Sequence, residues 1–367
     1  MAGASGDELT AEQRAVYDRQ LRVWGVEAQR RLGQATFFVA GLTGLSAEAC
    51  KNVVLAGIGS VVLFDDGTSA EDAHPGNFLA HAGVADHEGD AASLTAAEAT
   101  AATLAQMNPF GTVTVATPAV TGDASAAASA KGTQSDFAGI TEGMLKGVDV
   151  VLLGGASVAA RERVGDLARA AGAKIFAGAV RGYAADFVAD LGAVFEHVVE
   201  TNASSEPTKT TTKTATFVSL RAAMSSSWSD LGAGREGGTR RVNRLAAAAT
   251  ACAAFEKARG KPPSGKADLA AMIAQIPALE LQNGLKPGWM KPEALVEYTG
   301  GLSDASDAEV DAECVVAESP AVAAVAGGVL AQEMLRAVTK VGEPVRNAFF
   351  FSAADGQGTV ENLGCGK

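Results

Sequence analysis

Cysteine is scarce in this sequence of 367 residues, and its four cysteines are far apart: Cys50, Cys252, Cys314 and Cys365. No two of them form a C-x-x-C pair, which excludes a zinc knuckle and a redox dithiol. Cys50 and Cys252 fall within helical patterns, Cys314 follows an acidic run that disfavours a thiolate, and the fourth lies in the C-terminal tail. We therefore expect reduced cysteines that take no part in catalysis.

Histidine is equally sparse, with four residues: His74, His81, His87 and His197. Their separations match no metal-ligand motif. Each is expected to face solvent or to form a hydrogen bond in the core. The sequence thus predicts no metal site.

Positive charge is also in deficit, because 30 lysines and arginines face 42 acidic residues, which gives a net charge of −12. Such a surface repels phosphate backbones and anionic lipids. Nucleic acid and membrane surfaces are therefore not expected as partners.

Long hydrophobic runs are missing too. The longest, AVAAVAGGVLA at 321–331, falls well short of the roughly 20 residues that cross a bilayer, so no membrane span is expected. The polar, acidic start MAGASGDELTAEQR lacks the features of a secretory signal and predicts a protein inside the cell. The length and the 47% hydrophobic content predict two domains, or one domain with a large insertion.

Short apolar runs alternate with helical patterns along the first half of the chain. The runs predicted as strands are 35–42, 60–66, 112–120, 149–155 and 173–180. Helical spacing follows the first run, and helices are also expected at about 90–106 and 157–171. This alternation predicts an α/β fold with a Rossmann-like, doubly wound, mostly parallel sheet. Residues 183–192 alternate less cleanly and are predicted as an edge strand.

Composition changes after residue 200. A polar, threonine-rich stretch predicts an exposed crossing segment; mainly helical sequence follows it, and then a helix at 320–338 and a strand at 347–353 are expected to rejoin the sheet. The predicted parts are a flexible N-terminus (1–14), the first part of the sheet domain (15–200), an exposed linker (201–216), a mainly helical insertion (217–315) and a C-terminal part (316–367).

The turn after the first predicted strand, GLTGLSAE (41–48), invites comparison with the G-x-G-x-x-G turn of nucleotide-binding folds. Gly41 and Gly44 are present, but Thr43 stands at the second glycine position and Ser46 at the third. Side chains there add bulk where a phosphate would press against the backbone. A turn that keeps two glycines for its own geometry is the preferred interpretation, and nucleotide binding is the alternative.

Asp65 and Asp66 end the second predicted strand. An acidic residue there binds the ribose in many dinucleotide enzymes, but it also commonly caps a turn or a helix. Capping is preferred, because a nucleotide-dependent oxidoreductase would need the intact glycine turn.

The stretch YDRQLRVWG (17–25) precedes the first strand and places Arg19, Arg22 and Trp24 on one short helical segment. The residues alone leave two interpretations open. Either the arginines solvate a helix face above a packed tryptophan, or one of them has a functional partner.

Three separated stretches carry a family resemblance: YDRQLRVWGVEAQRRL (17–32), residues 39–66, and residues 320–338 with 347–364. Together they resemble the smaller, noncatalytic subunits of heterodimeric SUMO-activating enzymes, in the ThiF/MoeB-like ubiquitin-activating superfamily. The resemblance implies an adenylation-type fold that pairs with a homologous domain in a larger catalytic subunit. That subunit would hold ATP, Mg²⁺, SUMO and the catalytic cysteine. The small-residue helix at 320–338 is expected to be interface material.

The sequence departs from the active members of this superfamily at several positions. Those members carry D-x-D after the second strand, then N-x-x-R-Q, then a lysine. Here Asp65 is kept but Gly67 replaces the second aspartate, AHPGNFL (73–79) has no arginine, and GDAAS (89–93) supplies aspartate in place of lysine. These departures imply an inactive copy that binds no cofactor itself.

The remaining functional feature is the N-terminal helix. In the family its arginine reaches across the dimer to the partner's ATP phosphates, and by motif position that residue is Arg19. No cysteine here precedes a threonine, as the catalytic cysteine of the larger subunits does. The resemblance therefore implies a nuclear or cytoplasmic subunit for SUMO adenylation and transfer. The alternatives are the equivalent subunit for NEDD8 or ubiquitin activation, or an autonomous ThiF/MoeB-like adenylating enzyme.

Overall fold

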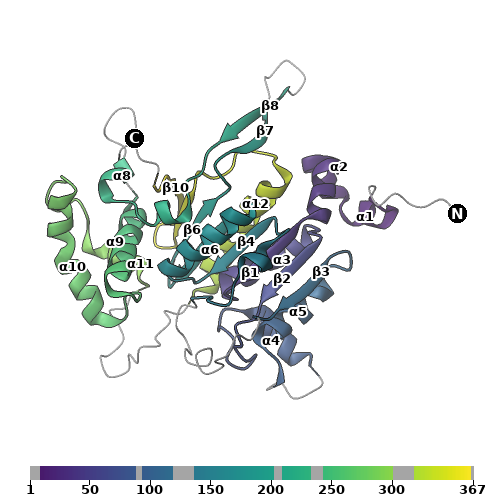
Figure 1. The fold of residues 1–367 in the computed structure, drawn as a ribbon, viewed down its shortest axis with the longest axis horizontal. Coiled ribbons are helices and arrows are strands. Elements are labelled where there is room, and N and C mark those ends of the chain that lie inside the picture. Colours follow the sequence, from purple (N-terminus) through teal and green to yellow (C-terminus); the bar gives the residue numbers. More distant parts are fainter. Residues whose placement is uncertain are drawn as a thin grey trace.

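The structure is a computed structural model that describes residues 9–87, 93–118, 136–201, 209–232, 243–300 and 318–364 (Figure 1). Its strands are β1 (Thr36–Ala40), β2 (Ser60–Phe64), β3 (Thr112–Ala116), β4 (Val150–Gly154), β5 (Lys174–Arg181), β6 (Ala184–Asp190), β7 (Phe195–Thr201), β8 (Lys209–Ala215), β9 (Ala348–Ser352) and β10 (Gln357–Glu361). Its helices are α1 (Ala11–Val16), α2 (Asp18–Gln34), α3 (Gly44–Leu55), α4 (Phe78–Ala85), α5 (Ala96–Met107), α6 (Val158–Ala171), α7 (Leu220–Ala223), α8 (Trp228–Gly232), α9 (Arg244–Arg259), α10 (Gly265–Gln282), α11 (Pro292–Tyr298) and α12 (Pro320–Thr339).

The main sheet has the order β10-β9-β6-β5-β4-β1-β2-β3. The strands from β3 to β5 in this order are parallel, and β6, β9 and β10 are antiparallel to their neighbours. The chain moves outward from β1 to β2 and β3, then returns to place β4 on the other side of β1, so the strand order reverses between β1 and β4. The predicted doubly wound, mostly parallel fold is confirmed.

The prediction that residues 183–192 form an edge strand is wrong. β6 lies between β5 and β9, and every residue in it is buried. A strand buried on both faces need not alternate, so the weak alternation marked an interior position. β9 pairs with β6 and β10 pairs with β9, and both of these strands come from the C-terminal end of the chain.

Alternate side chains of β1 enter two separate cores. Phe37 and Val39 pack with residues of α3 and α12, whereas Phe38 and Ala40 pack with residues of α6 and the helices after residue 217. Helices therefore cover both faces of the sheet (Figure 1). This is the packing that the period-2 geometry of a strand dictates.

Helix α12 is long and apolar enough, by length and composition, to cross a membrane, with a mean hydropathy of 1.4. The fold gives its apolar residues another role, because Val322, Ala326 and Leu330 are buried in the core beside α3. At Gly327 a Cβ would lie 2.6 Å from the Cβ of Glu48, so the absence of a side chain lets α12 approach α3 closely. One face of this helix thus serves the chain's own core, while Val325 on it is 45% exposed, and its place at an interface stays a prediction.

Two predicted boundaries differ from the observed elements. Residues 209–215, within the predicted linker 201–216, form β8, which pairs with β7 in a separate ribbon. β-branched threonines favour a strand, and the residues from 210 to 214 are exposed, as their polarity predicts. Helix α1 begins at Ala11, inside the predicted flexible segment 1–14, because the Thr10 hydroxyl accepts a hydrogen bond from the Gln13 backbone and caps the helix.

Candidate functional site

The site where this fold class binds nucleotides lies between the carboxyl ends of β1 and β4, where the strand order reverses. Gly41 follows β1 with a φ of 76°, and a Cβ there would lie 1.9 Å from the carbonyl oxygen of Gly154. The two strand ends thus touch, and only glycine fits at residue 41. This position supports the interpretation that the glycines serve the geometry of the turn.

Polar side chains occupy the rest of the turn. Thr43 caps α3 by accepting a hydrogen bond from the Ser46 backbone, and Ser46 Oγ donates to the Gly41 carbonyl at 2.6 Å. A Cβ on Gly154 would lie 2.1 Å from the same Oγ. Thr43 therefore stands where the second glycine of the G-x-G-x-x-G turn lets the backbone approach a pyrophosphate, and Ser46 stands where the third glycine lets the helix pack closely on the strand.

The Glu318 carboxylate lies against the N-terminus of α3. Its side chain is 4% exposed, and a Cβ on Gly44 or Gly76 would lie 2.5 or 2.9 Å from its Oε2. Burial raises the pKa of Glu318 to about 7, although the backbone N–H groups of Gly44 and Leu45 act in the opposite direction. An acidic side chain of the chain itself thus occupies the anion-attracting end of the helix.

The acidic residues after β2 are used within their own turn. Asp65 accepts a hydrogen bond from the Gly67 backbone at 2.8 Å, and Asp66 accepts one from the Thr68 backbone at 3.0 Å. Asp65 is buried and Asp66 is exposed. This arrangement agrees with the capping interpretation of both residues.

The segment 73–79 is built around a buried asparagine. Asn77 caps α4 by accepting from the Ala80 backbone and donates to Thr100 Oγ1 at 3.1 Å. His74 Nδ1 accepts from the Gly76 backbone, and burial lowers the pKa of His74. The Asn77 amide is thus used within the fold, as is His74 Nδ1, and the segment has no arginine. In the stretch 89–93, which has aspartate in place of the lysine of active members, residues 89–92 lie outside the described residues.

A buried ion-pair cluster lies at the junction of the sheet and the helices after residue 217. Asp186 of β6, 2% exposed, pairs with Arg161 at 3.3 Å and with Arg181, and it accepts a hydrogen bond from Tyr298 Oη at 3.0 Å. Burial alone would raise the pKa of Asp186, but the guanidinium groups, Arg181 above all, hold it below its ordinary value. The cluster ties α6, β5, β6 and α11 together.

The N-terminal helix is anchored to the body of the fold by its first residues. Tyr17 is buried, and its hydroxyl accepts a hydrogen bond from Asn108 Nδ2 at 2.8 Å. Gln20 donates to the carbonyl of Leu55 at the end of α3. These contacts hold the start of α2 in a fixed place.

A kink divides α2 at Gly25, where φ is 82° and ψ is 169°. Trp24 Nε1 donates to Gln29 Oε1 at 3.0 Å, and the buried Gln29 donates in turn to the Ala56 carbonyl. A Cβ at Gly25 would have no neighbour within 4 Å, so the glycine is needed for its left-handed backbone. Trp24 thus stabilises the kink through its hydrogen bond to a buried side chain on the other side of it.

The two arginines before the kink differ in their surroundings. Arg22 pairs with Asp18 one turn earlier, at 2.8 Å on an exposed surface. Arg19 is exposed and has neither an ion pair nor a hydrogen bond with any of the residues that the structure describes. The structure therefore leaves the Arg19 guanidinium available to another molecule.

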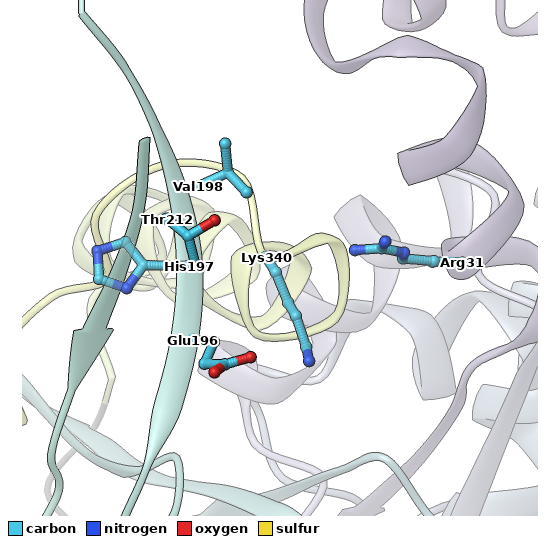
Figure 2. A pocket seen from close by; sticks show the side chains of 6 residues that line it. All are labelled: Arg31, Glu196, His197, Val198, Thr212 and Lys340. Atoms are coloured by element: carbon cyan, nitrogen blue, oxygen red, sulfur yellow. The ribbon is translucent and has the colours of Figure 1, made fainter. Parts of the chain in front are cut away.

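A cleft of about 450 Å³ opens beside the β7–β8 ribbon. Figure 2 shows the side chains of Arg31 and Lys340 in this cleft, with the Glu196 carboxylate facing Lys340 and the His197 ring turned away. Arg31 also donates to the Thr339 carbonyl at 3.1 Å, which joins α2 to the end of α12. Charges of both signs line the cleft, so it favours no ligand of one charge.

Cysteine and histidine contribute no site among the described residues. Burial raises the pKa of Cys50 and of Cys252 to about 12, which leaves almost no thiolate at neutral pH. His197 is buried against the Phe195 ring and has no hydrogen-bond partner within the described part of the chain, so the expectation that it faces solvent or forms a core hydrogen bond is wrong there. No metal-binding group of three His, Cys, Asp or Glu residues occurs in the described part of the chain. Cys314 and Cys365 lie outside it.

Glu318 and the Asp186 cluster were not predicted from the sequence. Glu318 is far from the glycine turn in sequence, and an acidic residue before a helix ordinarily suggests a cap. For Asp186 a signal did exist, because an aspartate inside an apolar strand needs a buried cation as its partner.

The doubly wound sheet, the glycine turn at the reversal of strand order and the acid-ended second strand define a nucleotide-type α/β fold. Residues 17–365 match the model of the ThiF family, and the chain belongs to that family. It is 30% identical to SUMO-activating enzyme subunit 1B-1 of Arabidopsis thaliana, over 98% of both chains. It is 28% identical to SUMO-activating enzyme subunit 1 of Danio rerio, over 96% of this chain and 95% of the relative, and 27% identical to that of Homo sapiens, over 98% of each. The predicted resemblance is confirmed.

Proposed function

We propose that this chain is the noncatalytic subunit of a SUMO-activating enzyme. It would pair with a larger catalytic subunit, which adenylates SUMO with ATP and Mg²⁺ and then takes SUMO onto its own cysteine. The observation that carries the proposal is the similarity to subunit 1 proteins over 98% of the chain. A nuclear location goes with this role, and the cytoplasm is compatible with it.

The geometry supports a chain that does not adenylate by itself. Glu318 takes the place of a phosphate at α3, and Asp65 is committed to the turn after β2. Adenylation needs cations and a metal to neutralise the charge that develops on the phosphates. The residues at this turn present an acid instead and do not fit a nucleotide phosphate.

Arg19 is the residue that this chain would contribute to the active site of the larger subunit. A guanidinium remains charged and its fork of donors binds two phosphate oxygens together. Arg19 is exposed and free, while Tyr17 and Gln20 fix the helix that bears it. We assign Arg19 to the ATP phosphates in the active site of the larger subunit.

Exposed apolar side chains occur on the same N-terminal helices as this arginine and at the end of α3, and they fit a protein partner. Val16, Val23 and Val26 on the N-terminal helices are 61%, 75% and 45% exposed, and Leu55 at the end of α3 is 48% exposed. Apolar groups of this kind are stabilised when a partner covers them. We propose that the larger subunit docks here.

Val23→Asp is expected to weaken the heterodimer at least about tenfold, because it places a charge in the apolar contact. The affinity of the two purified subunits, measured by titration calorimetry, checks this prediction. Leu281→Asp is the matched control, since Leu281 is 82% exposed on α10, within the separate helical block. An equal loss of affinity in both variants would contradict the docking site.

The proposal is tested by exchange of radiolabelled pyrophosphate into ATP in the presence of SUMO. The chain alone should give no exchange, and addition of the larger subunit should give exchange and a SUMO thioester on that subunit. Exchange by the isolated chain would instead indicate an autonomous adenylating enzyme. Replacing SUMO by NEDD8 or ubiquitin tests whether the complex activates one of those modifiers, a role that the similarity to SUMO-activating subunits does not favour.

A further inference from the structure

We propose that the anion-binding turn of this chain holds an internal ligand, the Glu318 carboxylate, and that this carboxylate excludes nucleotide phosphates. The inference deepens one part of the proposed function, the inactive nucleotide site, and rests on it. The ligand class that fits the turn is a carboxylate supplied by the chain itself.

The N-terminus of α3 provides the binding groups. A helix end attracts anions through its free backbone N–H groups and its dipole. Here the N–H groups of Gly44 and Leu45 and the Thr43 hydroxyl all face Glu318. A buried acidic side chain is therefore directed at this helix end.

Two glycines clamp the carboxylate from opposite segments. A Cβ at Gly44 would lie 2.5 Å from Glu318 Oε2, and a Cβ at Gly76 would lie 2.9 Å from the same atom and 3.1 Å from the Gly44 Cα. Any larger residue at either position would displace the acid. Oε2 itself is buried without a hydrogen-bond partner among the described residues, so the contact is made by shape as well as by charge.

The backbone places Glu318 at this position. It forms an isolated parallel bridge with Gly182, and the Ser319 N–H donates to the Gly182 carbonyl at 3.2 Å. Pro320 then starts α12, which packs closely against α3. The acid thus reaches the turn from a fixed point between two packed elements.

No nearby cation among the described residues provides a competing partner. His74 Nδ1 lies 4.0 Å from Oε2, but that nitrogen accepts a hydrogen bond from the Gly76 backbone, which requires the unprotonated form. Arg181 influences Glu318 only at a distance, since its guanidinium is paired with Asp186. The helix end is therefore the principal electrostatic partner of the carboxylate.

Chemical rescue tests this inference. Glu318→Ala removes a group with the atoms of acetate, whereas Glu318→Gln keeps the volume and leaves no room. At constant ionic strength, sodium acetate in about tenfold excess over its Kd should raise the thermal midpoint of Glu318→Ala by about 3 °C relative to chloride. The wild-type protein and Glu318→Gln should show only the general stabilisation that these salts give to any folded protein, with no saturable response to acetate, and the wild type should show no saturable response to inorganic phosphate.

Three results would overturn the inference: no response of Glu318→Ala to acetate beyond that of the wild type, an equal response of Glu318→Gln, or saturable stabilisation of the wild type by phosphate. If Glu318→Ala does not fold in chloride, refolding from urea in acetate answers the same question, since recovery must then depend on acetate. MgATP binding by the isolated wild type would contradict the inactive site itself. Failure of rescue alone leaves the role as a SUMO-activating subunit in place.

Discussion

In a reconstituted complex with the larger subunit, Arg19→Ala is expected to slow SUMO adenylation at least about 100-fold. The expected cause is the loss of the charge that we assign to the ATP phosphates as pyrophosphate departs. Arg19 makes no polar contact within the described residues, so its removal should leave the fold and the heterodimer unchanged. Single-turnover formation of the SUMO adenylate measures the effect, and size-exclusion chromatography checks the assembly.

Two matched variants sharpen this experiment. Arg22→Ala removes an arginine three residues later that is already paired with Asp18, so turnover should change little. Arg19→Lys keeps the charge but loses the bidentate fork, and its rate should fall between those of the wild type and Arg19→Ala. Unchanged adenylation with Arg19→Ala would remove this residue from the mechanism.

Asp186→Ala is expected to lower the free energy of unfolding by about 3–5 kcal/mol. The substitution leaves Arg161 and Arg181 buried without their shared carboxylate, and it deprives Tyr298 of its acceptor. Because domains are stable by only about 5–15 kcal/mol, this is a large fraction of the total. Urea denaturation followed by circular dichroism measures the change.

Asp166→Ala provides the comparison on the surface. Asp166 pairs with Arg221 at 2.6 Å, but both side chains are about half exposed, so the expected loss is about 0–1 kcal/mol. Since the pKa of Asp186 is held below its unfolded value near 3.9, its contribution is present above about pH 4 and declines as the pH falls further. Equal losses for the two variants at pH 7 would show that the buried cluster adds no more than a surface pair.

Local pattern was enough to predict the parallel half of the sheet. The predicted strands 35–42, 60–66, 149–155 and 173–180 contain β1, β2, β4 and nearly all of β5, because a buried parallel strand is a continuous apolar run between turns. The predictions that were wrong concern strands whose place depends on residues far away in the sequence. The interior place of β6 follows from strands near the C-terminus, and β8 is a strand only because β7 pairs with it.

The same difference between local sequence pattern and distant packing applies to the candidate site. The bulk of Thr43 and Ser46 in the turn could be inferred from their spacing, and the capping of Asp65 from its place after a strand. Glu318 could not, since only the packing of α12 on α3 brings it to the turn. The role of Arg19 came from family resemblance, because an unpaired arginine on a helix has no distinguishing pattern of its own.

The bend at Gly25 separates the anchored segment that carries Arg19 from the rest of α2. Because nothing lies within 4 Å of that glycine's missing side chain, packing places no constraint on the position, and the only demand is a left-handed backbone. A substitution at Gly25 would look tolerable if only side-chain contacts were considered. It would nevertheless strain the backbone by about 1–3 kcal/mol or straighten the bend. Either change would alter how the segment with Arg19 is held, so the defect would reach the reaction proposed for the partner as well as the chain's own melting curve.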